Sequence, residues 1–248
     1  MPDPIHQFDL HRILPLNLGG WDVSFTNSAA FMLATVLLST AFLVYAMRSR
    51  GLVPGRLQSV AEITHDFIAD MVRESMGKEG MKFFPFVFAI FMFIFVGNML
   101  GMIPGGFTVT SHIIVTAALA ALVFVMVLVV GFAKNGLHFL KLFVPSGVPW
   151  YVLWFVALIE IISFLSRPVS HSVRLFANML AGHIALKIFA SFIIALASAG
   201  IFTAILSPLP LLLVIALVAL ETLVAVLQAY VFATLTCIYL NDALHPGH

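Results

Sequence analysis

Long uncharged runs of apolar residues alternate with short charged segments in the first half of the chain. Three runs are long enough to cross a bilayer as upright helices, since about 20 residues span its hydrocarbon core: residues 29–47, 83–103 and 113–133. Residues 57–76 differ, because charged residues recur there at helical spacing on one face: Glu62, Asp66, Asp70 and Arg73. We therefore predict an amphipathic surface helix between the first and second spans.

Basic residues come soon after the first and third spans: Arg48, Arg50, Arg56, Lys134 and Lys141. The turn after the second span, at Pro104, Gly105 and Gly106, contains neither Lys nor Arg. Cytoplasmic connections carry an excess of Lys and Arg. This pattern predicts an amino terminus outside and the amphipathic helix on the inner surface.

Hydropathy alone would divide the chain beyond residue 148 into three upright helices, at about 149–166, 184–206 and 211–240. That division would place Arg167 and Arg174 in an outer loop without an acidic partner, against the charge pattern. Both arginines lie at membrane depth if residues 150–194 form one element. At 1.5 Å per residue this element is about 67 Å long, more than twice the core thickness of about 30 Å. It must tilt strongly or break, and Pro168 is the expected kink.

The final helix is expected over residues 208–240, because Pro208 and Pro210 suit a helix start. It would be about 48 Å long and therefore also inclined. The predicted fold class is thus all-α integral membrane, with about five crossings, the inner-surface amphipathic helix and two long tilted helices at the carboxy-terminal end. We expect residues 1–248 to form a single membrane domain with its carboxy terminus inside.

Composition supports burial in lipid. Of the 248 residues, 62% are hydrophobic and 9% charged, whereas a soluble domain has about 25% charged residues. The net charge of +1 says nothing about acidic partners, and no segment resembles a basic nucleic-acid-binding patch. Cys237 is the sole cysteine, which excludes an intrachain disulfide and a cysteine-based metal site. No phosphate loop, nucleophile motif or metal-ligand cluster is present, so we expect neither a catalytic residue nor a cofactor.

Polar residues form a stripe on the first long helix, within about 40° around its axis: Glu160, Arg167, His171, Arg174, Asn178 and Gly182. An ionisable group at membrane depth costs about 2.5–3.5 kcal/mol, so its default interpretation is functional. Arg167 lies nearer the inner end, and for it snorkelling to the interface is an alternative. The stripe predicts a hydrated or partner-facing surface.

The final helix carries three polar groups on one face: Glu221, Gln228 and Tyr239. Antiparallel pairing of the two long helices predicts the pairs Arg174–Gln228, His183–Glu221 and Glu160–Asp242. On an ideal helix His183 lies about 180° around from Arg174, so the first two pairs require a distorted helix or a path that wraps around it. A histidine level with an intramembrane glutamate is a candidate proton relay.

Residues 167–183 (RPVSHSVRLFANMLAGH) resemble the signature of subunit a of F-type ATP synthases, as does the later segment 227–232 (LQAYVF). The order of hydrophobic spans and the turn between Asn98 and Pro104 fit as well. The resemblance implies a non-catalytic stator that contacts a rotating ring of c subunits and the peripheral-stalk b-type subunits. It implies proton transport across an energy-transducing membrane, most simply the bacterial inner membrane, with the mitochondrial inner membrane as the alternative.

Carried over residue by residue, the family's essential arginine corresponds to Arg174, its neighbouring asparagine to Asn178 and its paired glutamine to Gln228. Some bacterial members exchange the residue types found here at His183 and Glu221. The residues expected to carry protons are Arg174, Asn178, His183, Glu221, Gln228 and Glu160, and those expected to support them are Arg167, His171, Gly182 and Tyr239. The resemblance implies two offset half-channels beside Arg174, and the histidine–glutamate pair favours H⁺ over Na⁺.

Two other classes of protein compete with this interpretation. A secondary proton-coupled transporter should show repeated halves and a substrate pocket at a broken helix, and no second copy of the Arg174 motif is present. A purely structural membrane anchor accounts for the amphipathic helix. It leaves the arginine in the middle of the membrane unexplained.

Overall fold

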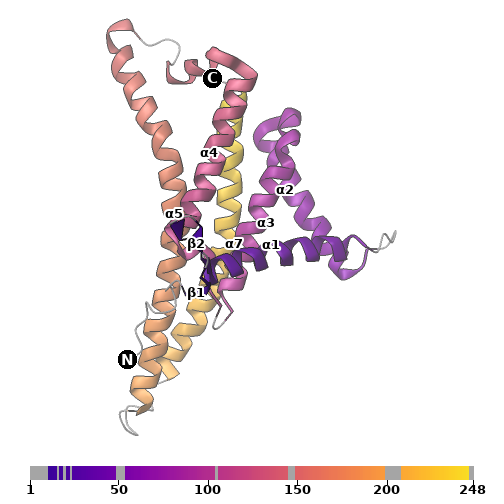
Figure 1. The fold of residues 1–248 in the computed structure, drawn as a ribbon, viewed down its shortest axis with the longest axis vertical. Coiled ribbons are helices and arrows are strands. Elements are labelled where there is room, and N and C mark those ends of the chain that lie inside the picture. Colours follow the sequence, from indigo (N-terminus) through magenta and orange to yellow (C-terminus); the bar gives the residue numbers. More distant parts are fainter. Residues whose placement is uncertain are drawn as a thin grey trace. The chain divides into compact units, whose positions relative to one another are not determined.

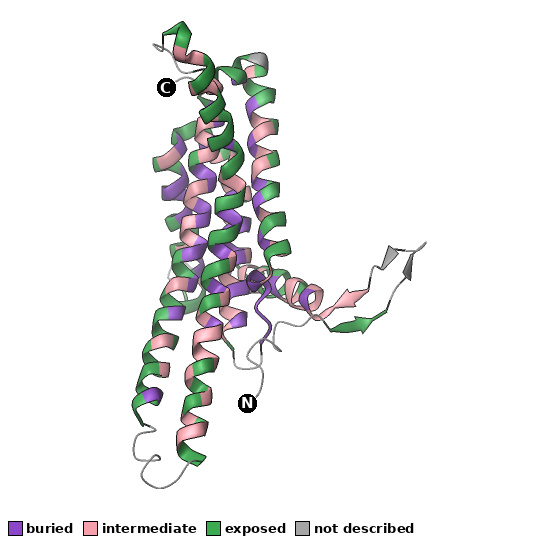
Figure 2. Ribbon diagram, turned by 90° about the vertical axis from the view of Figure 1, so that its left-hand side faces the viewer, coloured by how far each residue is buried: buried purple, intermediate pink, exposed green. Residues whose placement is uncertain are grey.

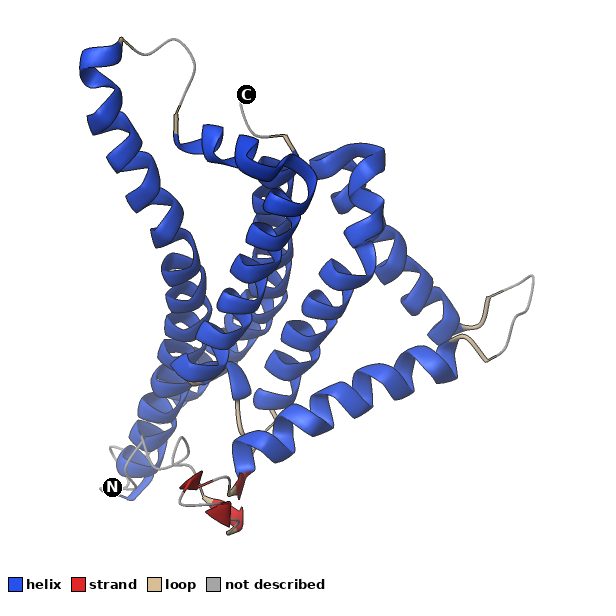
Figure 3. Cartoon of the chain, turned by 45° about the horizontal axis from the view of Figure 1, so that its top comes forward, coloured by secondary structure: helices blue, strands red, loops and turns tan. Residues whose placement is uncertain are grey.

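The computed structural model describes residues 11–15, 17–18, 21–22, 24–48, 54–103, 106–144, 149–198 and 208–245. Arg50 and the Pro104–Gly105 turn, used in the charge pattern above, lie outside them. Long α-helices account for most of this part of the chain (Figures 1 and 3): α1 (Asn27–Ala46), α2 (Arg56–Gly80), α3 (Phe84–Gly101), α4 (Ile113–Asn135), α5 (Trp150–Ser198) and α7 (Pro208–Leu244). Three short 3₁₀ helices connect them: η2 (Met81–Phe83), η3 (Val109–Ser111) and η4 (Gly136–Phe143).

Short strands precede α1, and the sequence pattern did not predict them. They form two antiparallel pairs, β1 (Arg12–Leu14) with β4 (Phe25–Thr26) and β2 (Asn17–Leu18) with β3 (Trp21–Asp22). None is longer than three residues, so they leave the fold class unchanged.

Five helical segments of the described chain are long and apolar enough to cross a membrane. They are α1, the α2–α3 segment, α4, α5 and α7, with 20, 46, 23, 49 and 37 residues. Figure 2 shows long runs of exposed positions on these helices, and many of the exposed residues are large and apolar. A soluble monomer rarely exposes so much apolar surface. The predicted all-α integral membrane fold is confirmed.

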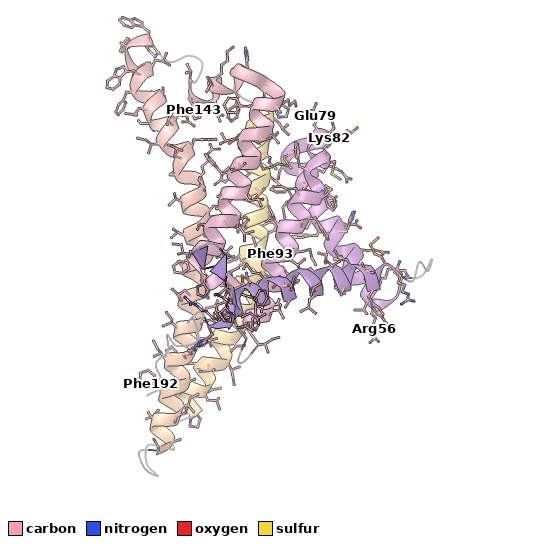
Figure 4. The ribbon with its side chains drawn as sticks, viewed as in Figure 1. Arg56, Glu79, Lys82, Phe93, Phe143 and Phe192 are labelled. Atoms are coloured by element: carbon pink, nitrogen blue, oxygen red, sulfur yellow. The ribbon has the colours of Figure 1, made fainter. Side chains whose placement is uncertain are left out.

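The α2 helix is amphipathic, as its sequence predicts. Ala61, Ile68 and Val72 are buried, whereas Asp66 and Asp70 on the other face are exposed. Figure 4 marks Arg56 at its start and Glu79 and Lys82 at its turn into α3. The placement of α2 on the inner membrane surface stays a prediction.

The α5 helix continues through Pro168, so the division into three upright helices is wrong. Proline removes one backbone donor and crowds the preceding turn, yet residues 166–174 are helical and form no loop. With 49 and 37 residues, α5 and α7 are about 74 and 56 Å long at 1.5 Å per residue. Both exceed the thickness of a bilayer core, and their tilt stays a prediction.

The chain forms two compact units, described separately below. Unit 1 contains Met1–Thr40, Phe93–His112 and Leu175–Ala229, and unit 2 contains Ala41–Met92, Ile113–Arg174 and Tyr230–His248. Each of α5 and α7 contributes one part to each unit. The single membrane domain expected from the sequence stays a prediction.

The core of unit 2 is aromatic where η4 meets α4 and α5. Phe139 of η4 is fully buried, and Phe164 of α5 lies 5.1 Å from Phe124 and 5.3 Å from Phe143 between ring centroids. A hydrogen bond joins Thr116 of α4 to Ser172 of α5, with 3.1 Å between their hydroxyl oxygens. These contacts fix α5 against α4 inside the unit, at the level where its polar stripe begins.

Candidate functional site

The predicted site residues occupy two helices. Glu160, Arg167, His171, Arg174, Asn178, Gly182 and His183 lie on α5, and Glu221, Gln228 and Tyr239 lie on α7. The structure gathers several of them into two polar clusters, one in each unit. Thr108, which the sequence reasoning did not select, completes the first cluster, and Asp242, which it selected only as a partner for Glu160, completes the second.

The first cluster, in unit 1, consists of Thr108, His183 and Glu221. Nδ1 of His183 lies 3.1 Å from Oε1 of Glu221, within ion-pair distance, and Nε2 of His183 lies 2.6 Å from Oγ1 of Thr108. All three residues are buried. The carboxylate oxygens of Glu221 have no aligned hydrogen bond to any described residue. The structure therefore brings together the histidine and the glutamate that the sequence paired.

Two glycines make room for this cluster. A Cβ atom on Gly182 would lie 2.9 Å from Oε1 of Glu221, closer than side chains normally approach. A Cβ atom on Gly101 would likewise collide with the hydroxyl of Thr108. The glycine at position 182 of the predicted stripe thus has a steric role, because the Glu221 carboxyl occupies the space in which a side chain would begin.

A buried hydrogen-bond network lies beside the first cluster in unit 1. Asn98 donates from Nδ2 to the carbonyl oxygen of Ala225 over 3.2 Å, and Thr110 donates to Oδ1 of Asn98 over 2.6 Å. Ser111 donates to the carbonyl oxygen of Thr108 over 2.6 Å. These bonds connect the end of α3 and the segment after it to α7. The sequence contains a signal for this network, because hydroxyl and amide side chains lie there among apolar residues. Such polar side chains need hydrogen-bond partners when they are buried.

The second cluster, in unit 2, consists of Arg167, Asp242, Tyr239, Phe164 and His171. Nη1 of Arg167 lies 2.7 Å from Oδ2 of Asp242. The guanidinium carbon lies 5.1 Å from the ring centroid of Tyr239 and 5.5 Å from that of Phe164, a cation–π geometry. Arg167 is therefore held by side chains of its own unit.

The predicted pairing of Glu160 with Asp242 is wrong, because Asp242 pairs with Arg167. The physical reason is charge. Two carboxylates at one level repel each other, whereas the guanidinium offers a bidentate partner of opposite sign. Glu160 is half-buried, two turns earlier on α5.

His171 is buried beside this ion pair. Its ring centroid lies 3.6 Å from that of Phe232 and 5.9 Å from that of Tyr239, and its Nε2 atom has no hydrogen-bond partner among the described residues. A cavity of about 10 Å³ adjoins His171, Arg167 and Tyr239, large enough for about one water molecule. The remaining lining residues are apolar: Ala120, Val123, Phe124, Val127, Phe164 and Pro168.

Arg174 and Asn178 are exposed, one helical turn apart on α5. Gln228 of α7 is buried. Arg174 belongs to unit 2 and Gln228 to unit 1, so their predicted pairing stays a prediction. An exposed guanidinium on a long apolar helix is costly in lipid and calls for a partner of opposite charge.

A third ion pair joins the charged ends of two helices, where Lys134 at the end of α4 donates to Glu79 at the end of α2. The hydrogen bond from Lys134 lowers the pKa of the Glu79 carboxyl below its usual value. Across the described residues no group of three or more His, Cys, Asp or Glu side chains is placed to hold a metal ion.

The fold and these clusters define a class of protein: a multi-pass membrane protein with ionisable groups buried on two long helices. Residues 29–241 match the family model described as ATP synthase A chain. The chain is 62% identical over 247 residues to ATP synthase subunit a of Azorhizobium caulinodans, covering 99% of each chain. It is 60% identical to that of Mesorhizobium japonicum, with 99% and 98% covered, and 61% identical to that of Nitrobacter hamburgensis over the full length of both chains.

The chain belongs to the ATP synthase A chain family. The resemblance seen in the sequence is thereby confirmed, and the transporter and anchor interpretations are set aside. The chain is a multi-pass subunit of an inner-membrane proton channel, takes part in ATP synthesis, and has no catalytic function of its own.

Proposed function

We propose that this chain is the stator of a rotary proton motor, with two offset half-channels separated by Arg174. Its partners would be a ring of c subunits, which present a carboxylate to Arg174, and peripheral-stalk b-type subunits. The similarity of the chain to ATP synthase subunit a of other bacteria supports membership of such a complex. Lipid covers the apolar remainder of the five spans, and protons are the transported ion.

The observation that carries this proposal is the buried pair of His183 and Glu221. An imidazole exchanges its proton near neutral pH, and both imidazole and carboxyl side chains act as proton donors and acceptors in proteins. Their placement on two apolar helices costs free energy. The default interpretation of such residues is therefore that a function retains them. The carboxylate of Glu221 has an ion-pair contact with His183 but no aligned hydrogen bond to a described residue, which suits a group whose partner comes and goes with the proton.

Arg174 would supply a fixed positive charge. An arginine side chain does not lose its proton in proteins, so it can hold a carboxylate in its ionised form without conducting protons itself. At about 4 Å and an effective dielectric constant of 20 the attraction is about 4 kcal/mol. The ionised carboxylate cannot enter lipid, so it must take up a proton before the ring carries it away from Arg174.

The two half-channels would lie on opposite sides of Arg174 along α5. His183, Glu221 and Asn178 line the path from the outside, and Glu160 lines the path to the inside. In this proposal Gln228 would pair with Arg174, and the residues that support the two paths would be Arg167, His171, Gly182 and Tyr239. A membrane potential of 100 mV contributes about 2.3 kcal/mol per proton.

The orientation follows from the charge pattern. We infer an amino terminus outside and a carboxy terminus in the cytoplasm. On this orientation α2 lies along the inner surface. We also propose that the two units form one membrane domain and that the two long helices tilt strongly. The exposed acidic face of α2 is then available to the peripheral stalk.

The test is Arg174→Ala in the assembled complex. Proton-driven ATP synthesis should fall to background, because the ring carboxylate loses the charge that holds it ionised at the interface. Arg73→Ala, on the exposed face of α2, is the matched control and should leave synthesis near the wild-type rate. Coupled synthesis at the normal rate in Arg174→Ala would refute the role. Arg174→Lys keeps the charge but loses the planar fork, and it separates the two contributions.

A further inference from the structure

Thr108 stands out among the residues that the site did not require. It lies directly before η3, is 2% exposed, and places its hydroxyl oxygen 2.6 Å from Nε2 of His183. Nε2 is the ring nitrogen farther from Glu221, because Nδ1 is the atom at ion-pair distance from the carboxyl. The imidazole therefore lies between a hydroxyl and a carboxyl, and each ring nitrogen has its own neighbour.

A hydroxyl is suited to this position because it both donates and accepts hydrogen bonds. When His183 is neutral with its proton on Nδ1, facing Glu221, the hydroxyl of Thr108 donates to Nε2. When His183 is protonated, Nε2–H donates to the oxygen of Thr108. A backbone carbonyl could only accept, and a backbone amide could only donate. The hydroxyl alone leaves Nε2 paired in both states.

The surrounding residues hold the Thr108 hydroxyl in place. The absence of a side chain at Gly101 provides the space that it fills. Ser111 binds the backbone carbonyl of Thr108, and Thr110 binds Asn98, which in turn binds the backbone of α7 four residues after Glu221. The segment that carries Thr108 is thus tied to the helix that carries Glu221, within one unit.

We propose that Thr108 is a positioning residue that keeps the imidazole of His183 hydrogen-bonded through both of its protonation states. This inference rests on the proposed function, since it gives Thr108 a part in proton exchange at His183. Glu221 of α7 and Lys187, one turn further along α5, are charged groups that act on His183. In the connection between α3 and α4, the hydroxyl of Thr108 contacts His183. The next titratable residue along this connection is His112.

The experiment measures passive proton flux through the membrane sector, reconstituted in vesicles and driven by a potassium diffusion potential. Thr108→Val removes the hydroxyl at constant shape, and flux per assembled complex should fall about tenfold or more, since a hydrogen bond to a charged group is lost. The outer pH of half-maximal flux should also move to a more acidic value. The reason is that the imidazolium loses a stronger hydrogen bond to the hydroxyl than the neutral ring does. Thr108→Ser keeps the hydroxyl and should retain flux within about twofold of wild type, with an unchanged pH profile.

Thr222→Val is the matched control. Thr222 is the exposed neighbour of Glu221 on α7, and its hydroxyl donates to Val218 of its own helix over 2.8 Å. Its replacement should leave both flux and pH profile unchanged. If Thr108→Val is not incorporated into the complex, Thr108→Ala and Thr108→Ser give the same comparison, because they differ by one oxygen atom.

Normal flux with an unshifted pH profile in Thr108→Val or Thr108→Ala overturns the inference. Equal losses in the serine and valine variants also overturn it, because serine keeps the hydroxyl, so the loss would then not follow the presence of the hydroxyl. Glu221→Gln separates this failure from a failure of the proposed function. If Glu221→Gln conducts protons normally, the proposed function fails. If it does not conduct while the Thr108 variants do, only the role of Thr108 is lost.

Discussion

The helices α5 and α7 form two contacts between ionisable side chains of opposite charge, one buried and one half-buried, and the contacts differ in the cation. In unit 1 His183 meets Glu221 at 3.1 Å, and in unit 2 Arg167 meets Asp242 at 2.7 Å. Histidine exchanges its proton near neutral pH, whereas arginine keeps its proton throughout. One contact can therefore load and unload a proton, and the other is a permanent ion pair.

The surroundings of the two contacts also suit an exchangeable proton in one case and a fixed charge in the other. Around His183 and Glu221 lie a hydroxyl and the space left by glycine, and the two side chains are only 9% and 4% exposed. Around Arg167 lie the faces of two aromatic rings, which stabilise a fixed cation. The comparison teaches that burial alone does not identify a proton path. The chemistry of the neighbouring groups does.

Glu221→Gln should have the largest effect in this comparison. Glutamine keeps the shape of the side chain but cannot exchange a proton, so passive proton flux should fall about a hundredfold or more. The flux is measured in vesicles at a fixed diffusion potential and normalised to assembled complex. Glu62→Gln on the exposed face of α2 is the control. A flux above one tenth of wild type in Glu221→Gln would contradict the exchangeable character of the first contact.

Gly182→Ala should have an intermediate effect. The added Cβ would lie 2.9 Å from Oε1 of Glu221, so the carboxyl must move away from His183. Misplacement by a fraction of an ångström should lower proton flux by about threefold to tenfold. Gly97→Ala is the matched control, since its Cβ would meet Thr35 of α1 at an ordinary 3.6 Å. Glu221→Asp, with a shorter side chain, should restore part of the flux in Gly182→Ala, and no restoration would argue against a steric role.

Sequence reasoning predicted the fold class, because the length and hydropathy of membrane helices are read directly from the chain. It also placed His183 against Glu221, since few polar residues on two apolar helices leave few possible partners. The predicted partner of Asp242 was wrong. Pairing the two helices level by level takes no account of side-chain length and charge, and the carboxylate of Asp242 binds Arg167 instead of lying beside Glu160. Sequence reasoning missed Thr108 and Thr110, which lie outside the long helices and reach the site only through tertiary structure.

Arg167→Gln should have the smallest effect on flux and act mainly on stability. It leaves Asp242 without its partner, and because the two side chains are 22% and 33% exposed, water screens part of the cost. We expect a loss of about 1–2 kcal/mol in the free energy of unfolding, less than for a fully buried pair. Proton flux per assembled complex should stay well above that of Glu221→Gln.

A double-mutant cycle measures the pair itself. Arg167→Gln with Asp242→Asn removes both charges and should recover most of the lost thermal stability, because neither side chain is then left as an unpaired ion. Arg167→Lys keeps the charge but loses the stacking on Tyr239 and Phe164, and should fall between wild type and Arg167→Gln. If Asp242→Asn changes the thermal stability by the same amount in wild type and in Arg167→Gln, the pair is not coupled. If Arg167→Gln instead stops proton flux in fully assembled complexes, the second contact belongs to the proton path, and the division between an exchangeable and a fixed pair is wrong.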